Sequence, residues 1–183
     1  FTPPPLGGGS GVGISLHVDG HGKIWSASIP GATVFDPAKE KFSYFKPLTP
    51  GVGGYGVAGD SQGNGWFCIP AVDIVGVADF PTGKVTEIPL RPQPGADELL
   101  TPEDRKFYET VNTNATAGKL ISQGPRRMSA GGNYVWWSNW WGASISKADI
   151  RTHEVSYYSP PIPSNVYTTA VDKNGIVWVP TLG

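Results

Sequence analysis

Short apolar runs alternate with clusters of turn-forming residues along most of the chain, a pattern typical of a protein built from short strands. Examples are 42-FSYF-45, 85-VTEI-88 and 155-VSYY-158, and each run soon meets a proline. One segment differs: 101-TPEDRKFYETV-111 offers a capping Thr, a Pro at the first helical position and two early acidic residues. The pattern predicts an all-β chain with one short helix.

One motif recurs along this pattern: an Asp, a Gly three residues later and a Trp six residues later. It occurs as 18-VDGHGKIW-25, 59-GDSQGNGW-66 and 171-VDKNGIVW-178. An Asp that starts a turn can accept hydrogen bonds from backbone N–H groups two residues on, and Gly supplies a left-handed backbone conformation. We therefore expect each copy to be a turn between two strands, with the Trp on the second strand.

A fourth, degenerate copy has Ala130 in place of the Asp, Asn133 in place of the Gly, and Trp136. Asn tolerates positive φ best after Gly, so Asn133 is expected to take the left-handed position of the turn. The interval between Asp19 and Asp60 is 41 residues, and that between Ala130 and Asp172 is 42.

A period near 42 residues with four short strands per unit is typical of a β-propeller blade. The Trp side chains are large enough to fill the space between neighbouring blades. The markers Trp25, Trp66, Trp136 and Trp178 predict about four blades over residues 1–183, with an insert at about 91–124. We favour a segment of a larger wheel, since seven-bladed wheels are common, over a ring closed by joining the two ends in one blade.

Composition excludes several other classes of function. Charged residues are 16% of the chain and the net charge is −1, without a Lys/Arg block, so neither a nucleic-acid footprint nor a polybasic membrane patch is expected. No apolar run reaches the roughly 18 residues of a membrane span. The one cysteine, Cys68, excludes an internal disulfide and is expected to be buried. No signal peptide is visible, which is compatible with a mature exported protein and with a cytosolic one.

The amino-acid sequence of the repeats resembles that of the virginiamycin B lyase (streptogramin lyase) family of β-propellers. The residues that carry the resemblance are 168-TTAVDKNGIVWV-179, 57-VAGDSQGNGWF-67 and 134-YVWWSNWWGASISKADI-150. The resemblance covers nearly the whole chain except the insert. It implies a propeller fold, an exported protein and, as function, a C–O lyase that opens a cyclic ester by elimination, with magnesium as cofactor.

The resemblance also implies a Glu/His acid–base group five residues before the blade Asp. The matching positions here are Tyr55 and Tyr167, with Pro125 in the degenerate copy and Ile14 in the first copy. No Glu/His pair stands at any of these strand starts, and Asn139 stands where family members often have Glu. A carboxamide does not exchange protons as a carboxylate does. Lyase chemistry would therefore need groups that these positions do not supply.

Propeller connectivity places the loops between second and third strands, and those between blades, on one face. The predicted binding residues follow these loops: Tyr55, Asp73, Arg126, Arg127, Asn139, Trp140, Trp141 and Tyr167. Indole rings at Trp140 and Trp141 would stack on a sugar or an aromatic ligand, or be covered by the insert.

Two arginines lead from the insert into an innermost strand. Arg126 and Arg127 would meet an anionic ligand, or pair with acidic residues of the insert, namely Asp97, Glu98 or Asp104. Asp73 is a lone loop carboxylate and a poor metal site by itself. No metal-binding constellation is evident in the sequence.

His17 stands two residues before Asp19, where the other copies have Ala58, Ala170 and Met128. A titratable side chain on the innermost strand would reach the channel, which makes His17 the one weak catalytic candidate, although a satisfied interior histidine is the simpler interpretation. Three hypotheses remain: a lyase-like enzyme, a module that binds a small-molecule or polymer ligand, and an interaction module within a longer propeller chain.

Overall fold

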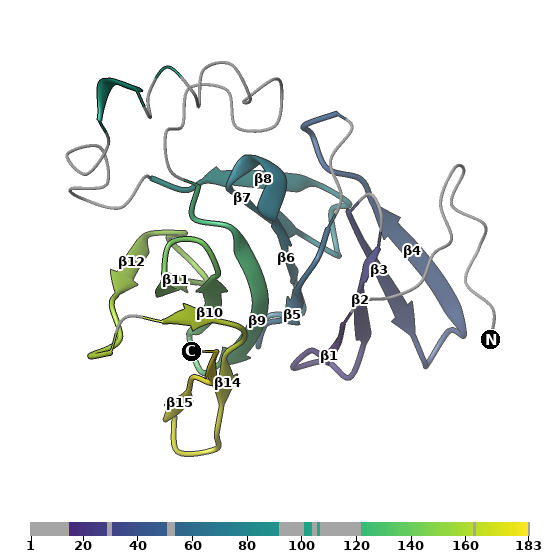
Figure 1. The fold of residues 1–183 in the computed structure, drawn as a ribbon. Helices are drawn as coiled ribbons and strands as arrows, with labels where there is room; N and C mark the ends of the chain where they lie inside the picture. The colour runs from purple at the N-terminus through teal and green to yellow at the C-terminus, as the bar shows by residue number, and fades with distance from the viewer. Residues whose placement is uncertain are drawn as a thin grey trace.

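The computed structural model describes residues 15–28, 31–50, 54–91, 101–103, 106, 122–162 and 164–182. Three four-stranded antiparallel sheets and two strand pairs make up nearly all of this structure (Figure 1). The first sheet contains β1 (Leu16–Val18), β2 (Ile24–Ser28), β3 (Gly31–Asp36) and β4 (Lys41–Phe45). The second contains β5 (Val57–Gly59), β6 (Gly65–Ile69), β7 (Ile74–Ala78) and β8 (Val85–Pro89).

The third sheet contains β9 (Pro125–Gly131), β10 (Tyr134–Asn139), β11 (Ser144–Asp149) and β12 (Val155–Tyr158). A fourth unit consists of one interrupted hairpin, in which β13 pairs with β16 and β14 pairs with β15. Its strands are β13 (Asn165–Val166), β14 (Ala170–Val171), β15 (Val177–Trp178) and β16 (Thr181–Leu182).

The sheets are blades of a β-propeller. Within each sheet the strands follow chain order, and the first strands of neighbouring sheets lie side by side: β1 contacts β5, β5 contacts β9, and β9 contacts β14. Figure 1 shows the sheets fanning out from these innermost strands. The predicted fold class is therefore confirmed, with three complete blades and a two-stranded fourth unit in the part of the chain that the structure describes.

Helical structure is sparse in the described residues. Pro102, Glu103 and Lys106 are helical, within the segment where the sequence predicts a helix, and most of the remaining residues of that segment lie outside the described ranges. A 3-10 turn, η1 (Pro70–Val72), connects β6 to β7. The predicted insert is likewise described only at 91, 101–103, 106 and 122–124.

The repeated Asp closes the turn and also holds the Trp. In the second blade one carboxylate oxygen of Asp60 accepts hydrogen bonds from the backbone N–H groups of Gln62 and Asn64, each at 2.9 Å. The other oxygen accepts the indole N–H of Trp66 at 2.9 Å. Asp19 and Asp172 bind their own turn and their own Trp in the same way. The six-residue spacing therefore lets one carboxylate fix both the hairpin and the ring.

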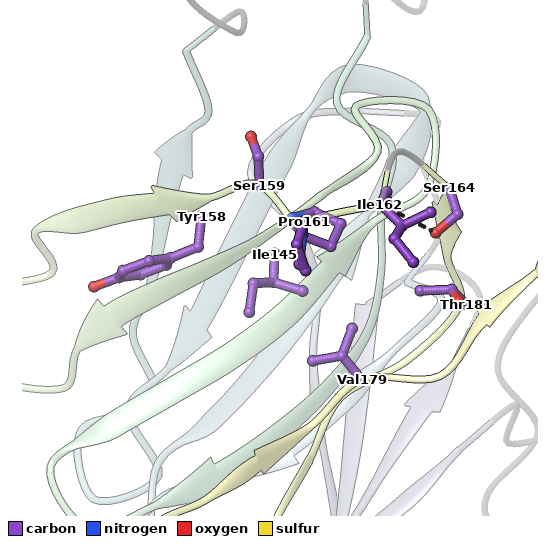
Figure 2. A pocket seen from close by; sticks show the side chains of 9 residues that line it. Ile145, Tyr158, Ser159, Pro161, Ile162, Ser164, Val179 and Thr181 are labelled. Atoms are coloured by element: carbon purple, nitrogen blue, oxygen red, sulfur yellow. Dashed lines mark hydrogen bonds between the residues drawn. The ribbon is translucent and has the colours of Figure 1, made fainter.

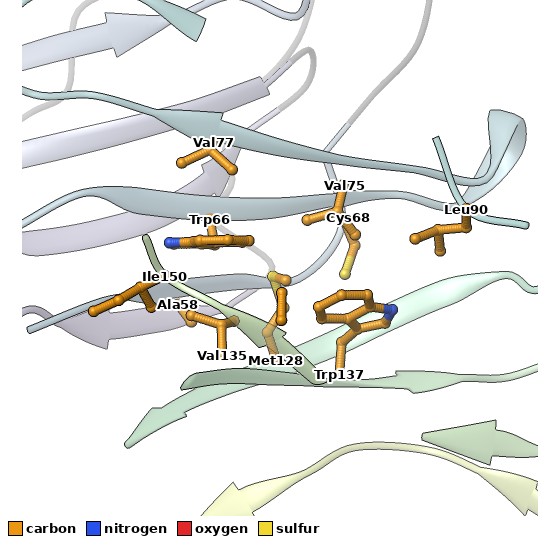
Figure 3. Packing of buried hydrophobic residues seen from close by; sticks show 11 residues of the cluster. Ala58, Trp66, Cys68, Val75, Val77, Leu90, Met128, Val135, Trp137 and Ile150 are labelled. Atoms are coloured by element: carbon orange, nitrogen blue, oxygen red, sulfur yellow. The ribbon is translucent and has the colours of Figure 1, made fainter. Parts of the chain in front are cut away.

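The Trp rings are wedged between blades, as predicted. Trp66 is fully buried, and it lies between the second blade and side chains of the third, among them Met128 and Val135 (Figure 3). Trp25 is fully buried between the first and second blades. Its ring packs directly on Gly65, where a Cβ would overlap it. Cys68 is buried in the same cluster as Trp66, also as predicted.

In the degenerate copy, the expectation for the turn was wrong while the Trp assignment holds. The positive φ is at Gly132, at 58°, and Asn133 is not among the residues with positive φ. Tyr134 pairs directly with Gly131, so only two residues form the loop, and positive φ at the first of these is what a type II′ turn requires. Without an Asp carboxylate to span a wider turn, the hairpin closes more tightly.

Trp136 nevertheless faces the fourth unit, alongside Val171, while its neighbour Trp137 is fully buried toward the second blade. The side chains of adjacent strand residues point to opposite sheet faces, as expected. Trp178 holds the equivalent position in the fourth unit and is 61% exposed. Thus Trp25 and Trp66 pack against a following blade, Trp136 lines a pocket beside the fourth unit, and Trp178 lies at an open face.

We predict that Asp60→Ala lowers the free energy of unfolding by about 3 kcal/mol, because it leaves the Trp66 indole and two turn N–H groups without their acceptor in a buried place. Asp172→Ala removes the same three bonds around an exposed ring and is expected to cost less than about 1 kcal/mol. Urea unfolding of both variants measures the difference. An equal loss of unfolding free energy in the two variants would contradict the role given to the buried Asp60 carboxylate.

Candidate functional site

A small cavity of about 260 Å3 opens on the face that carries the connections between second and third strands. It is lined by residues from the second and third blades and the segment that leads into β9: Tyr55, Pro70, Gly124, Arg126, Trp140 and Trp141. Four of these six are among the residues that the sequence singles out. The proposed site consists of this cavity and the adjoining side chains of Arg127 and Tyr167.

Asp73 fixes the segment that enters β9. It has a left-handed backbone, at φ 52°, and its side chain is fully buried. Its carboxylate accepts hydrogen bonds from the Ser122 hydroxyl at 2.7 Å and from the backbone N–H groups of Gln123 and Gly124, each at 2.8 Å. The carboxylate thus ties the second blade to the start of the third. Asp73 does not line the cavity.

The other side of this segment pairs with the loop between β10 and β11. The backbone N–H of Trp140 donates to the carbonyl of Gly124 at 2.9 Å, and that of Gly142 donates to the carbonyl of Gln123 at 3.0 Å. Gly124 has φ 61°, and a Cβ there would overlap the ring of Trp141. A residue without a side chain is therefore required for Trp141 to lie over the segment.

Arg126 lies at the centre of the aromatic side chains. Its guanidinium carbon is 4.4 Å from the ring centroid of Trp140, 4.7 Å from that of Tyr167 and 5.1 Å from that of Tyr55. Its Nη2 also donates to the Tyr55 hydroxyl at 3.2 Å. Trp140 and Tyr167 contact each other edge to face, with centroids 5.9 Å apart. These cation–π contacts hold the guanidinium among rings from three blades.

Arg127 adds a second positive charge at the same place. Its guanidinium carbon is 5.3 Å from the ring of Tyr167 and 5.5 Å from that of Tyr55. The hydrogen bond from Arg126 is the main cause that lowers the pKa of Tyr55 below its usual value, and a hydrogen bond with Tyr167 and the charges of both arginines act in the same direction. Two guanidinium groups thus contact the same pair of tyrosine rings.

Asn139 is placed apart from this cluster. It is fully buried at the end of β10, and its side-chain amide donates to the hydroxyls of Ser144 at 3.0 Å and Ser146 at 2.7 Å. These bonds connect β10 to β11, and Asn139 does not line the cavity. Of the eight predicted binding residues, the structure brings six together, whereas Asp73 and Asn139 support neighbouring segments.

His17 also lies away from the cavity. Its Nδ1 accepts a hydrogen bond from the backbone N–H of Gly59 at 3.0 Å, which connects β1 to β5. This bond needs the neutral ring. Burial is the largest influence and lowers the pKa of His17 below 6.5, although the backbone at Val18 and the charge of Asp19 act in the opposite direction. His17 therefore connects two blades, and a catalytic role for it stays a prediction.

We predict a pH-dependent stability that His17 controls. A folded-state pKa below the unfolded value means that the unfolded chain binds the proton more readily. The contribution is complete above about pH 6.5 and is lost as the pH falls through the folded-state pKa. His17→Asn offers an amide oxygen to Gly59 that does not titrate, so its melting temperature should fall less than that of the wild type between about pH 7.5 and 5.5. An equal fall in melting temperature in the two proteins over this pH range would refute this role.

A larger, apolar cavity of about 490 Å3 lies between the third blade and the fourth unit (Figure 2). Its lining includes Ile145 and Tyr158, which pair across β11 and β12. The equivalent pair in the first blade is Ala32 and Phe45. Phe45 is 5% exposed beneath the second blade, whereas Tyr158 is 42% exposed. The cavity occupies the place where the third and fourth strands of a complete blade would pack, so the architecture accounts for it.

The described residues also bear on two predictions about metal and membrane. Among them, no group of three His, Cys, Asp or Glu side chains is arranged to hold a metal ion. The residues that line the cavity offer no carboxylate, and Arg126 would repel a cation, so they do not fit magnesium. No helix in the described ranges is long and apolar enough to cross a membrane.

Comparison with known proteins supports the fold class through structure rather than sequence. No protein-family model matches the chain, and no curated protein matches it in sequence. The fold is similar to that of virginiamycin B lyase from Staphylococcus aureus, with a TM-score of 0.68 at 15% identity, over 96% of this chain and 50% of the lyase. The chain thus spans half the length of that structure, and the resemblance seen in the sequence is confirmed for the fold.

Two other solved structures widen the comparison. The β-propeller domain of Swd1 from Myceliophteria thermophila has a TM-score of 0.60 at 14% identity, over 92% of this chain and 50% of that domain. The extracellular domain of BT4673 from B. thetaiotaomicron has a TM-score of 0.58 at 12% identity, over 96% of this chain and 20% of that one. Proteins with different names thus share this fold, and the fold alone does not assign an activity.

Two residues of the cavity were not singled out by sequence. Pro70 lies in a loop between a second and a third strand, which the sequence places on the face where the cavity opens. Nothing in the sequence distinguishes it from other loop prolines. Gly124 stands directly before Pro125, and this Gly-Pro pair signals a turn without indicating that a Trp packs on it. Both residues contribute shape, which residue type alone does not reveal.

Proposed function

We propose that this propeller binds a small ring-bearing ligand, an aromatic compound or a sugar, in the cavity between its second and third blades. The observation that carries the proposal is the gathering of Tyr55, Trp140 and Trp141 around one cavity with Arg126 at its side. Aromatic faces with a few polar groups are typical of ligand sites. An apolar cavity of about 150 Å3 already accepts benzene, so the volume suits a single ring.

The rigidity of the walls supports the same proposal. Tyr55 is held by a backbone hydrogen bond to Cys68 at 2.9 Å, and the loop with Trp140 is bonded to Gly124. A cavity whose walls are fixed before binding loses little conformational entropy when a ligand enters. The proposal includes export of the protein, supported by the likeness to the extracellular domain of BT4673. The ligand is a small molecule or one unit of a polymer.

We predict that benzamide or methyl β-D-glucopyranoside, two neutral ring compounds, binds the full chain and that Trp140→Ala weakens this binding roughly tenfold, as expected for the loss of one stacking partner. Trp141→Ala should weaken binding as well, because its ring also lines the cavity. Isothermal titration calorimetry measures both.

The matched control is Trp178→Ala, which removes an exposed indole that does not line the cavity, and its affinity should equal that of the wild type. Unchanged affinity in both Trp140→Ala and Trp141→Ala would refute the proposed site.

A C–O lyase is the second candidate, and one observation favours it beyond the fold. Tyr55 and Tyr167 stand at the positions that match the acid–base residues of the virginiamycin B lyase family, and both lie against Arg126. Because Arg126 lowers the pKa of Tyr55, the phenolate is easier to form there than in water, and a phenolate is a competent general base.

Under the binding proposal, the full chain forms no product from a streptogramin-type depsipeptide, either with magnesium or with a chelator. Product analysis by mass spectrometry tests this expectation. Turnover that is lost in Tyr55→Phe, with binding retained, would establish the lyase instead.

A further inference from the structure

We propose that the ligand of this cavity carries a carboxylate or a similar planar anion, which Arg126 binds while the aromatic side chains hold the ring. This inference rests on the proposed function and specifies the chemical class of the ligand. The same cavity would then distinguish a ring acid, such as an aromatic acid or a uronic acid, from the neutral compound of the same shape.

The hydrogen-bonding state of Arg126 is the first support. A guanidinium has five N–H donors. Within the described residues, Arg126 makes one hydrogen bond, to the Tyr55 hydroxyl, and no carboxylate lies within ion-pair distance of it. Its other contacts are with ring faces, which attract the positive charge but accept little hydrogen bonding. Donors therefore remain for a planar, two-oxygen acceptor such as a carboxylate.

The second support is the local accumulation of positive charge. Two consecutive arginines contact the same two tyrosine rings, and the guanidinium carbons of both lie within 5.5 Å of those ring centroids. Arg127 makes a further interaction of its own, so the charge that an anionic ligand meets at the cavity is that of Arg126.

The third support is that the acidic side chain of the neighbouring loop, Asp73, is bound to other residues. Asp73 lies in the loop between β6 and β7, next to Pro70 of the cavity, yet its carboxylate faces Ser122, Gln123 and Gly124 and binds all three. It holds the backbone in place and does not line the cavity. The described lining thus combines aromatic walls with one cationic group.

Three compounds with the same ring test the inference: benzoate, benzamide and benzamidine carry a negative charge, no charge and a positive charge. With the full chain we expect benzoate to bind roughly tenfold more tightly than benzamide, and benzamidine to bind most weakly. The benzoate affinity should fall as salt is added, because the added contribution is electrostatic. Calorimetric titration gives all three affinities under identical conditions.

Arg126→Met removes the charge and keeps an unbranched side chain against the rings. It should abolish the preference for benzoate, so that benzoate and benzamide bind this variant with similar affinity. The matched control is Arg151→Met, which removes an exposed arginine paired with Asp149 in the turn after β11 and should keep the full preference. Far-UV circular dichroism of each variant confirms that the blades are folded.

The outcomes separate the two proposals. Equal affinity for benzoate and benzamide, with both lost in Trp140→Ala, would overturn the anion inference and leave ring binding intact. A benzoate preference that persists in Arg126→Met would also overturn it, because the charge would then come from elsewhere. If neither a neutral ring nor benzoate binds, the proposed function fails and the inference fails with it.

Discussion

One carboxylate, shared between a turn and an indole ring, is the interaction on which the rest of this structure depends. It fixes the distance from the start of the hairpin to the Trp, and the Trp in turn sets the spacing between blades. Asp60 and Trp66 are both buried, so the position of the turn and the position of the indole ring depend on each other. Neither can move without breaking a buried hydrogen bond. Repetition of this unit keeps the first strands of the blades side by side.

This constraint also explains why the aromatic cluster forms. Tyr55 and Tyr167 each stand five residues before their blade Asp, so the repeat places them at equivalent heights near the centre of one face. Arg126, close to the same position in the third blade, comes between them. Tyr55 and Tyr167 are more than a hundred positions apart in the chain. They meet because the Asp–Trp hydrogen bonds give their two strands the same register relative to the turn.

The periodicity of the sequence predicts the blades, the inter-blade Trp residues and the loop-bearing face, and the structure brings together six of the residues chosen from those loops, whose role in binding stays a prediction. Features that depend on the neighbours of a side chain could not be predicted in this way. Asp73 looks like an exposed loop carboxylate until it is seen to bind the segment before β9. Asn139 is similarly defined by two serine hydroxyls across the sheet. Gly132 replaces Asn133 as the left-handed residue because a missing carboxylate changes the loop length.

The anchoring of the segment before β9 has a consequence for how such a wheel can diversify. The side chain of Gln123 donates to the carbonyl of Arg91 at 2.9 Å, and Asp73 binds the residues on either side of Gln123, so the two ends of the insert are fastened to the scaffold and to each other. The junction is thus a natural grafting point, where segments of other lengths and chemistries can be exchanged above the same face of the wheel.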